Sequence, residues 1–390
     1  MATRLTSPDG RMSVRRAKKR NKMVMLYGLC AICVCAALAV FAYRLGARAQ
    51  APVAEATPMP TPIIAALSAT TPIPTPTPTP EPTPIPTPPL YPQTTSEPDY
   101  SFFWFTDTQH YAKKYPETFH KMTKWMAENI DTYNTKYVFF TGDVVHNFDD
   151  KEQWAVANEA MKQLDGVVPY TMIGGNHDVG KTTEDRDYYL SYFGKKRFSG
   201  NKNITSWMED GMGRCDVFTI NDTDYIVLGF SYGISISSGI RWMNQRLAEY
   251  PNHHAILLQH DYMTTDGQLS DAGKQVHAGV VVKNPNVFMV LCGHRYNCTL
   301  LVTSINDAGD YLSYRTVYNV MMNYQAFENG GDGYLAIIRV YENDKMFTID
   351  TYSPTLDDWY RVDPARSVNK ERLVLPVTIF DPPPPDEPAQ

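Results

Sequence analysis

Cysteine is scarce in this chain, which has six among its 390 residues. Three of the six fall within one uncharged apolar run near the N-terminus, and the others are Cys215, Cys292 and Cys298. An odd number of thiols outside that run excludes a complete disulfide framework, although Cys292 and Cys298 could pair if their strand ends approach each other. We expect three buried, unpaired thiols. No C-x-x-C motif or compact Cys/His cluster predicts a structural zinc site in this part of the chain.

Positive charge is also scarce beyond the first fifty residues. The remaining chain holds 26 of the 36 Lys and Arg but 41 of the 42 Asp and Glu, which gives it a formal net charge of −15. An acidic exterior argues against non-specific binding to nucleic acids or other anionic polymers. We therefore expect no nucleic-acid partner, except where a nucleic acid is itself a substrate.

One long uncharged apolar run extends from Met23 to Tyr43, about the ~20 residues that a helix needs to cross a bilayer. Six Lys and Arg lie just before it, and basic flanks stay in the cytoplasm. The sequence thus predicts a basic cytoplasmic tail (1–22), a transmembrane signal-anchor (23–43) and an extracytoplasmic remainder in a single-pass cell-membrane protein. The alternative is a secreted protein cleaved near Ala49. We favour the anchor because the run exceeds the roughly 7–15 residues of a usual signal core.

Residues 44–98 are dominated by Pro, Thr and Ala and cannot form a packed core. Such a segment predicts an extended polyproline spacer of roughly 3 Å per residue, or a disordered linker. The proline-rich tail at 381–390 is expected to be unstructured too. Residues 99–380 then form one domain, which we expect to be monomeric.

Five short apolar runs in this domain each end at a side chain that can bind a metal ion. They are rich in β-branched and aromatic residues and alternate with helical patterns, as is typical of strands buried on both faces. The side chains that follow them are, in chain order, Asp107, Asp143, Asn176 with His177, His260, and His294. Ligands in such sheets lie beyond the carboxyl ends of the strands, so these residues are expected to converge.

The other periodic segments predict an α/β fold with two sheets between helices. Helical faces are expected at 119–130 and 154–164, and a hairpin turns at Asn221-Asp222. Strand-like runs between 300 and 352 predict a second, more antiparallel sheet.

The donor types indicate a pair of divalent ions. A carboxylate with two oxygens can bridge two cations roughly 3.5–4 Å apart, and Asp143 is the natural bridge. Mixed imidazole and carboxylate ligation suits two transition metal ions such as Mn, Fe or Zn. Asp178, directly after His177, could hold that imidazole ring in place for proton donation.

This motif order resembles the calcineurin-like metallophosphoesterase family, which includes purple acid phosphatases. The matching motifs, from Phe102 to Tyr352, are Asp107-x-Gln109, Gly142-Asp143, Gly175-Asn176-His177-Asp178, His260 and Gly293-His294. The resemblance implies a four-layer αββα sandwich of two mixed sheets flanked by helices. It also implies hydrolysis of phosphate mono- or diesters by in-line attack of a metal-bound hydroxide.

Carried over by position, the resemblance assigns roles to individual residues. Asp107 and Asp143 would bind the first ion. The ligands of the second ion would be Asp143, Asn176, His260 and His294. His177 would protonate the leaving alkoxide. Apart from the resemblance, Asn176 is a candidate for substrate contact, and the forked guanidinium group of Arg295 could pair with a substrate phosphate or form a structural ion pair.

Two departures from the family pattern fall on the first ion's site. The family usually has His where this chain has Gln109, and its Gly-His-x-His motif ends here in Tyr296. His146, three residues after Asp143, could compensate, while the Gln109 oxygen and the Tyr296 phenolate are weaker candidates. The favoured hypothesis is a membrane-tethered phosphoesterase. The alternatives are an impaired single-metal relative that binds a phosphorylated ligand, and a structural surface protein.

Overall fold

The computed structural model describes residues 96–307, 314–359 and 372–380. The predicted cytoplasmic tail, membrane span and C-terminal tail, and the linker up to residue 95, lie outside these residues. Within the described part of the chain, no helix combines the length and apolar character needed to cross a bilayer.

The first sheet joins strands from the two ends of the domain. Its strand order is β13-β12-β11-β1-β2-β3, and β14 also pairs with β12. The strands are β1 (Tyr100–Phe105), β2 (Thr135–Phe140), β3 (Tyr170–Met172), β11 (Leu335–Tyr341), β12 (Met346–Ser353), β13 (Asp358–Trp359) and β14 (Leu373–Pro376). β1, β2 and β3 are parallel, whereas β11 runs antiparallel beside β1, so the sheet is mixed.

The second sheet is mixed too, in the order β4-β5-β6-β7-β8-β10-β9. Its strands are β4 (Ile204–Trp207), β5 (Gly213–Ile220), β6 (Thr223–Phe230), β7 (His254–Gln259), β8 (Val287–Cys292), β9 (Asn297–Ile305) and β10 (Arg315–Asn323). The central strands β6, β7, β8 and β10 are parallel. The predicted hairpin is confirmed: β5 and β6 are joined by a tight turn in which Asn221 has a φ of +51°.

The predicted grouping of the late strands was wrong. The four runs between 300 and 352 do not form one separate sheet. β9 and β10 extend the sheet of β7 and β8, while β11 and β12 extend the sheet of β1. β10 thus pairs with the edge strand β8, and β11 pairs with the edge strand β1. Local sequence periodicity does not show which distant strand will pair with such an edge.

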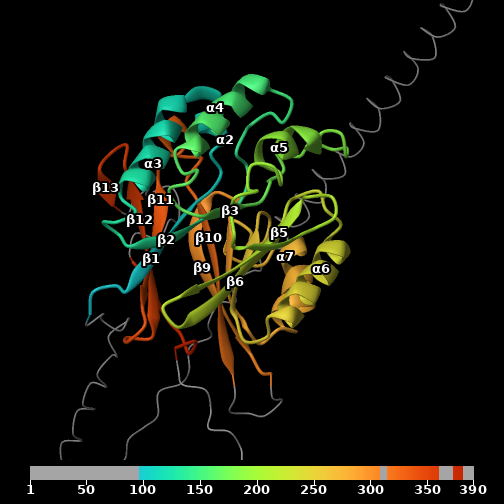
Figure 1. Cartoon of the computed structure of the whole chain (residues 1–390), viewed down its shortest axis with the longest axis vertical. Helices are drawn as coiled ribbons and strands as arrows, with labels where there is room; N and C mark the ends of the chain where they lie inside the picture. The colour runs from blue at the N-terminus through green and yellow to red at the C-terminus, as the bar shows by residue number, and fades with distance from the viewer. Residues whose placement is uncertain (1–95, 308–313, 360–371, 381–390) are drawn as a thin grey trace, which may run out of the picture. The chain divides into compact units, whose positions relative to one another are not determined.

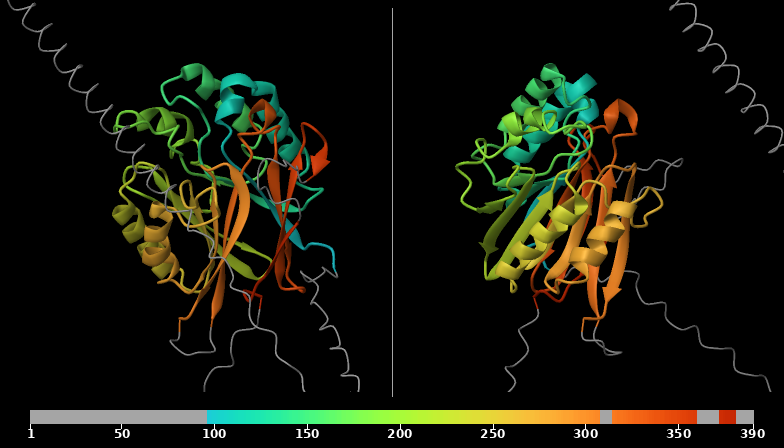
Figure 2. Two further views of the ribbon diagram at one scale, coloured as in Figure 1. Left: turned by 180° about the vertical axis from the view of Figure 1, so that it is seen from behind. Right: turned by 90° about the vertical axis from the view of Figure 1, so that its right-hand side faces the viewer.

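Helices lie against the outer face of each sheet (Figure 1, Figure 2). The first sheet is covered by α2 (Gln109–Lys114), α3 (Pro116–Glu128), α4 (Lys151–Lys162) and α5 (Arg186–Phe193). The second is covered by α6 (Ile236–Glu249), α7 (Asp271–Val276) and the π-helical turn His277–Val281. Two short caps explain where helices begin: Asp150 accepts hydrogen bonds from backbone amides of α4, and Ser270 does so for α7. The predicted α/β fold of two mixed sheets with helices is confirmed.

The apolar core has three parts. One lies between the sheets, where Phe102, Phe139 and Tyr225 are buried and the hydroxyl oxygens of Tyr100 and Tyr225 are 2.7 Å apart. The second lies under α3 and α4, and the third lies under α6 and α7. Cys215, Cys292 and Cys298 are buried and unpaired, as predicted.

Candidate metal centre

Three of the predicted ligands have a left-handed backbone. The φ angles are +53° at Asp107, +60° at Asp143 and +69° at His294, in a region that L-residues other than glycine rarely occupy. Each residue lies just beyond the carboxyl end of a parallel strand: β1, β2 and β8 respectively. This geometry turns the chain sharply away from the strand. Strain of this kind, repeated at three converging positions, is typical of a functional site.

Glycines beside the ligands allow the strand ends to meet. A Cβ atom at Gly175 would lie 2.1 Å from Asp143 Oδ1, and one at Gly293 would lie 2.1 Å from Asp107 Oδ2. Neither carboxylate could keep its position next to a larger residue. The glycines in the two motifs are therefore required by the close approach of neighbouring loops to the carboxylates.

Asp143, His260 and His294 form the group that could hold one ion. Their ligand atoms all lie within 4.8 Å of one another, and Asp143 and His260 are buried. His260 Nε2 is 3.3 Å from Asp143 Oδ1 and 3.1 Å from Asn176 Oδ1. The structure thus brings together all four residues predicted for the second ion.

The ring of His260 is oriented by the loop after β2. Its Nδ1 atom lies 2.9 Å from the carbonyl oxygen of Thr141, which can only accept a hydrogen bond. Nδ1 therefore carries the proton of the neutral ring, and the Nε2 lone pair faces Asp143. This is the arrangement that a metal-ligating histidine needs.

Asp107 is not part of the group of three but lies next to it. Its carboxylate accepts hydrogen bonds from Thr106 Oγ1 at 2.7 Å and from the His294 backbone N–H at 3.1 Å. Gln109 Nε2 donates to Asp143 Oδ2 at 3.2 Å. Gln325 Nε2 donates to Asp107 Oδ1 at 3.3 Å. Each of the two carboxylates predicted for the first ion is thus hydrogen-bonded to one glutamine amide.

His146 and Tyr296, the predicted compensating candidates, lie differently. The ring of His146 stacks on that of His177 with centroids 4.8 Å apart, and it is not part of the group of three. Its role as a ligand stays a prediction. Tyr296 is 54% exposed, so its phenol is not held at the carboxylates.

His177 is held by the loop that carries His146. Its Nδ1 atom is 2.7 Å from the His146 carbonyl oxygen, so Nδ1–H donates there and Nε2 is left for other partners. Its backbone N–H donates to Asp143 Oδ1 at 2.9 Å. The same carboxylate oxygen thus positions the proton donor predicted for the reaction and faces the second ion's histidine.

The expected contact of Asp178 with the His177 ring is not formed. The carboxylate of Asp178 is fully buried and instead accepts three backbone hydrogen bonds, from Val144 at 2.8 Å, Val145 at 3.0 Å and Gly175 at 2.7 Å. Its acceptor oxygens face the amides of the loop after β2, away from the ring that follows β3. Asp178 therefore ties two strand ends together, and the orienting role assigned to it was wrong.

The electrostatics of the cluster favour added positive charge. Burial raises the pKa of Asp107 to about 7; His260 opposes this shift, and the nearby Asp143 carboxylate adds to it. Burial by itself lowers the pKa of His260, but Asp143 outweighs it and raises that pKa to about 10. Among the described residues, no Lys or Arg forms a salt bridge with Asp107 or Asp143. Without a bound cation, the raised pKa of His260 favours a second proton on the ring, whose positive charge offsets the negative charge of Asp143. Bound cations would supply this positive charge instead, so the donor set fits divalent ions.

A pocket of about 480 Å³ opens beside His260. Phe230, Tyr232 and Ile234 contribute apolar walls, and Asp261 contributes the one carboxylate. The ring of Tyr232 is 42% exposed, with its centroid 6.4 Å from that of His260 and 6.3 Å from that of His294. Arg295, predicted to contact the substrate, is exposed next to His294. The cluster is thus accessible to a substrate from this side.

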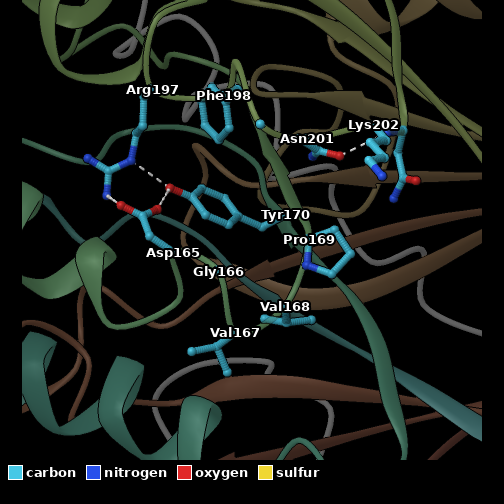
Figure 3. A pocket seen from close by; sticks show the side chains of 12 residues that line it. Asp165, Gly166, Val167, Val168, Pro169, Tyr170, Arg197, Phe198, Asn201 and Lys202 are labelled. Atoms are coloured by element: carbon cyan, nitrogen blue, oxygen red, sulfur yellow. Dashed lines mark hydrogen bonds and ion pairs between the residues drawn. The ribbon is translucent and has the colours of Figure 1, made fainter.

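A second hollow, of about 470 Å³, lies at the opposite, amino end of β3 (Figure 3). There Arg197 bonds the Tyr170 hydroxyl at 2.6 Å and forms a salt bridge with Asp165 at 2.9 Å. No predicted site residue lines this hollow. The guanidinium group of Arg197 is thus already bound by Tyr170 and Asp165.

The calcineurin-like phosphoesterase family model matches residues 100–298, just over half of the chain. This chain belongs to that family. The matched region contains every motif quoted above, and the predicted family is confirmed. The match assigns residues 100–298 to a calcineurin-like phosphoesterase domain.

One curated protein and two solved structures that are similar to this chain differ in their identity and coverage. "Uncharacterized protein YvnB" of Bacillus subtilis (strain 168) is 36% identical over 281 residues, which cover 72% of this chain but 22% of that protein. The chain therefore spans about a fifth of that relative's length. A dimetal phosphatase from Danio rerio is 10% identical with a TM-score of 0.48, over 72% of this chain and 99% of that one. A purple acid phosphatase from yellow lupin (Lupinus luteus) is 11% identical with a TM-score of 0.47, over 67% and 52% respectively.

Gln325 is the residue near the site that the sequence interpretation missed. It follows β10, which runs parallel to β8 in the same sheet. Ligands lie beyond the carboxyl ends of parallel strands, and this rule, applied to β10, would have identified Gln325. It did not, because the run from 314 to 320 was assigned to a separate antiparallel sheet.

Proposed function

We propose that the domain at 99–380 hydrolyses phosphate mono- or diesters with two divalent transition metal ions such as Mn, Fe or Zn. The observation that supports this most directly is the convergence of Asp143, His260 and His294 ligand atoms within 4.8 Å, with the Asn176 oxygen 3.1 Å from His260 Nε2. These groups come from β2, β3, β7 and β8, in two different sheets. Apart from a metal site, we find no reason for burying a carboxylate among imidazoles in this way.

When bound, the two ions would polarise the phosphate and activate the attacking water. Asp143 would lie between the ions, with Asp107 on one side and Asn176, His260 and His294 on the other. The Gly142 and Gly175 backbones approach these side chains closely enough to limit their movement. The rigid strand ends would thus hold the ligands before the substrate arrives.

His177 would give a proton to the leaving oxygen. Its Nδ1–H is already held by the His146 carbonyl, so the proton to be transferred would be on Nε2. Because its backbone N–H donates to Asp143, the ring stays next to the ions without being one of their ligands. Asn176 and the exposed Arg295 would contact the phosphate, Arg295 through its forked guanidinium group.

We further propose that this domain faces the outside of a cell membrane, on the anchor and spacer predicted at 23–43 and 44–98. The support is the basic segment that precedes the apolar run. In cells that express the full chain, protease added outside should remove the domain. N-terminal sequencing of the protein recovered from the medium would reveal the alternative, cleavage near Ala49.

Hydrolysis of p-nitrophenyl phosphate and bis-p-nitrophenyl phosphate by the metal-loaded chain tests the activity. Comparing the two rates separates monoester from diester preference. The alternative, a single-metal relative that only binds a phosphorylated ligand, is favoured by the replacement of two expected imidazole-type ligands by Gln109 and the exposed Tyr296. That alternative predicts one bound ion per chain and no turnover of either ester.

A further inference from the structure

Two glutamine side chains lie against the carboxylates of the first ion's site. Gln109 begins α2 and is 1% exposed, and Gln325 follows β10 and is buried as well. Gln109 Nε2 is 3.2 Å from Asp143 Oδ2, and Gln325 Nε2 is 3.3 Å from Asp107 Oδ1. Each glutamine thus contacts one of the two carboxylates, and the negative charges of these two carboxylates lie close enough to act on each other.

The amide oxygen of Gln109 is buried without a hydrogen-bond partner among the described residues. A buried acceptor that finds no donor costs free energy, so its presence needs a reason. The two ends of an amide exchange places by a half-turn about the last side-chain bond. Next to bare carboxylates, the NH₂ end faces the negative charge. With a cation between the carboxylates, the oxygen end is favoured there instead.

We propose that Gln109 and Gln325 supply amide oxygens to the first ion and complete a site whose other ligands are Asp107 and Asp143. All four donors are then oxygen atoms. Carboxylate and carbonyl oxygens prefer hard cations such as Mn²⁺ or Mg²⁺, whereas imidazole suits borderline ions such as Zn²⁺. The site with His260 and His294 would therefore take Zn²⁺, and the all-oxygen site would take Mn²⁺ or Mg²⁺.

His146 Nδ1, like the amide oxygen of Gln109, is buried without a hydrogen-bond partner among the described residues. Tyr296 is 54% exposed, and the His146 ring stacks between those of His110 and His177, with centroids at 5.4 and 4.8 Å. The inference depends on the proposed function only in that it assumes two ions in one cluster.

Equilibrium dialysis of the full chain against equal concentrations of Zn²⁺ and Mn²⁺, followed by elemental analysis, tests this assignment. We expect one Zn²⁺ and one Mn²⁺ per chain. Gln109→Ala and Gln325→Ala should each weaken Mn²⁺ binding by about tenfold or more and leave Zn²⁺ bound, in line with the ~10–100-fold effects of groups that support metal sites. Two Zn²⁺ without Mn²⁺, or alanine variants that bind Mn²⁺ like the wild type, would overturn the assignment.

Gln109→Glu and Gln325→Glu separate a ligand from a hydrogen-bond donor. If the glutamines are ligands, a carboxylate of the same shape should tighten Mn²⁺ binding by about tenfold or more, since added ligand charge raises the affinity for hard cations. If they only donate hydrogen bonds to Asp107 and Asp143, the new charge repels its neighbours and Mn²⁺ binding does not improve. That second result contradicts the proposal. Gln275→Glu, on the exposed face of α7, controls for added surface charge.

The two proposals can fail separately. A chain that binds one ion of each kind but hydrolyses neither nitrophenyl ester removes the proposed function and keeps the amide-oxygen site. Hydrolysis by a chain that holds two Zn²⁺ ions and ignores Mn²⁺ removes the amide-oxygen site and keeps the function.

Discussion

The Nδ1 atom of His177 lies 2.7 Å from the carbonyl oxygen of His146. A carbonyl can only accept, so this contact fixes which ring nitrogen carries the proton of the neutral form and directs Nε2 away from the backbone. The His146 and His177 rings also stack, which limits rotation of His177 about its side-chain bonds. A residue that must give a proton to one oxygen of a substrate needs this kind of restraint.

His177→Ala should therefore lower kcat for an alkyl phosphate such as glycerol phosphate, whose leaving alkoxide needs a proton, by about 10²–10⁴-fold, the range attributed to a positioned acid. Both ions should remain bound, because the ring coordinates neither of them in our proposal. Steady-state kinetics with elemental analysis of the same sample measures both effects. His120→Ala, on α3 away from the cluster, is the control variant. A kcat equal to that of the wild type would remove the assigned role.

Asp178→Asn should affect stability more than chemistry. The amide keeps one acceptor oxygen where the carboxylate used two to bind the N–H groups of Val144, Val145 and Gly175. One buried N–H then faces an NH₂ group and loses its acceptor, which costs about 1–3 kcal/mol of unfolding free energy. Urea unfolding of the metal-free protein measures this change. Asp149→Asn, at an exposed position in the loop after β2, should have little effect. Equal urea midpoints for the Asp178 and Asp149 variants would contradict the prediction.

The five strand ends could be predicted from sequence because each is a local feature. An apolar run followed closely by an acid, amide or imidazole is visible within about six residues, and parallel strands bring such ends together at one edge of a sheet. For this reason the structure has Asp107, Asp143, Asn176, His260 and His294 where the interpretation expected ligands.

The errors come from interactions between distant segments. Asp178 follows His177 directly, which made a contact with that ring plausible, but the amides it binds belong to a loop more than thirty residues away. The pairing of β10 with β8 was not visible for the same reason, and Gln325 was missed with it. A sequence shows which groups a strand end carries, but not which other strand lies beside it.

Asp143→Asn and His294→Ala should affect the ions differently. A bridging residue contacts both cations, so Asp143→Asn should weaken both by about tenfold or more, whereas His294→Ala should weaken only one. Elemental analysis after dialysis against a series of free-ion concentrations gives the two affinities. The loss of a single ion from Asp143→Asn would show that this carboxylate does not bridge.

The buried thiols should be inert in the folded protein. Burial raises the pKa of Cys215 to about 12 and that of Cys298 to about 11, so the reactive thiolate is almost absent at pH 8. In a full-length chain in which the three N-terminal cysteines are replaced by serine, Ellman's reagent at pH 8 should find no fast-reacting thiol. In denaturant it should find three. A fast native thiol would indicate an opening of the core near β5 or β9.

Tyr232 should contribute to the binding of aryl esters. Its ring is 42% exposed at the pocket beside His260, and its centroid lies 6.3 Å from that of His294. An aromatic leaving group in this pocket could stack on the ring, a contact of about 0.5–1.5 kcal/mol, so Tyr232→Ala should raise KM for p-nitrophenyl phosphate roughly two- to tenfold. The value of kcat should change little, because the ring has no part in proton transfer or ion binding. Tyr232→Phe keeps the ring and should behave like the wild type. A KM that rises equally for Tyr232→Phe and Tyr232→Ala would assign the effect to the hydroxyl group and exclude stacking as its cause.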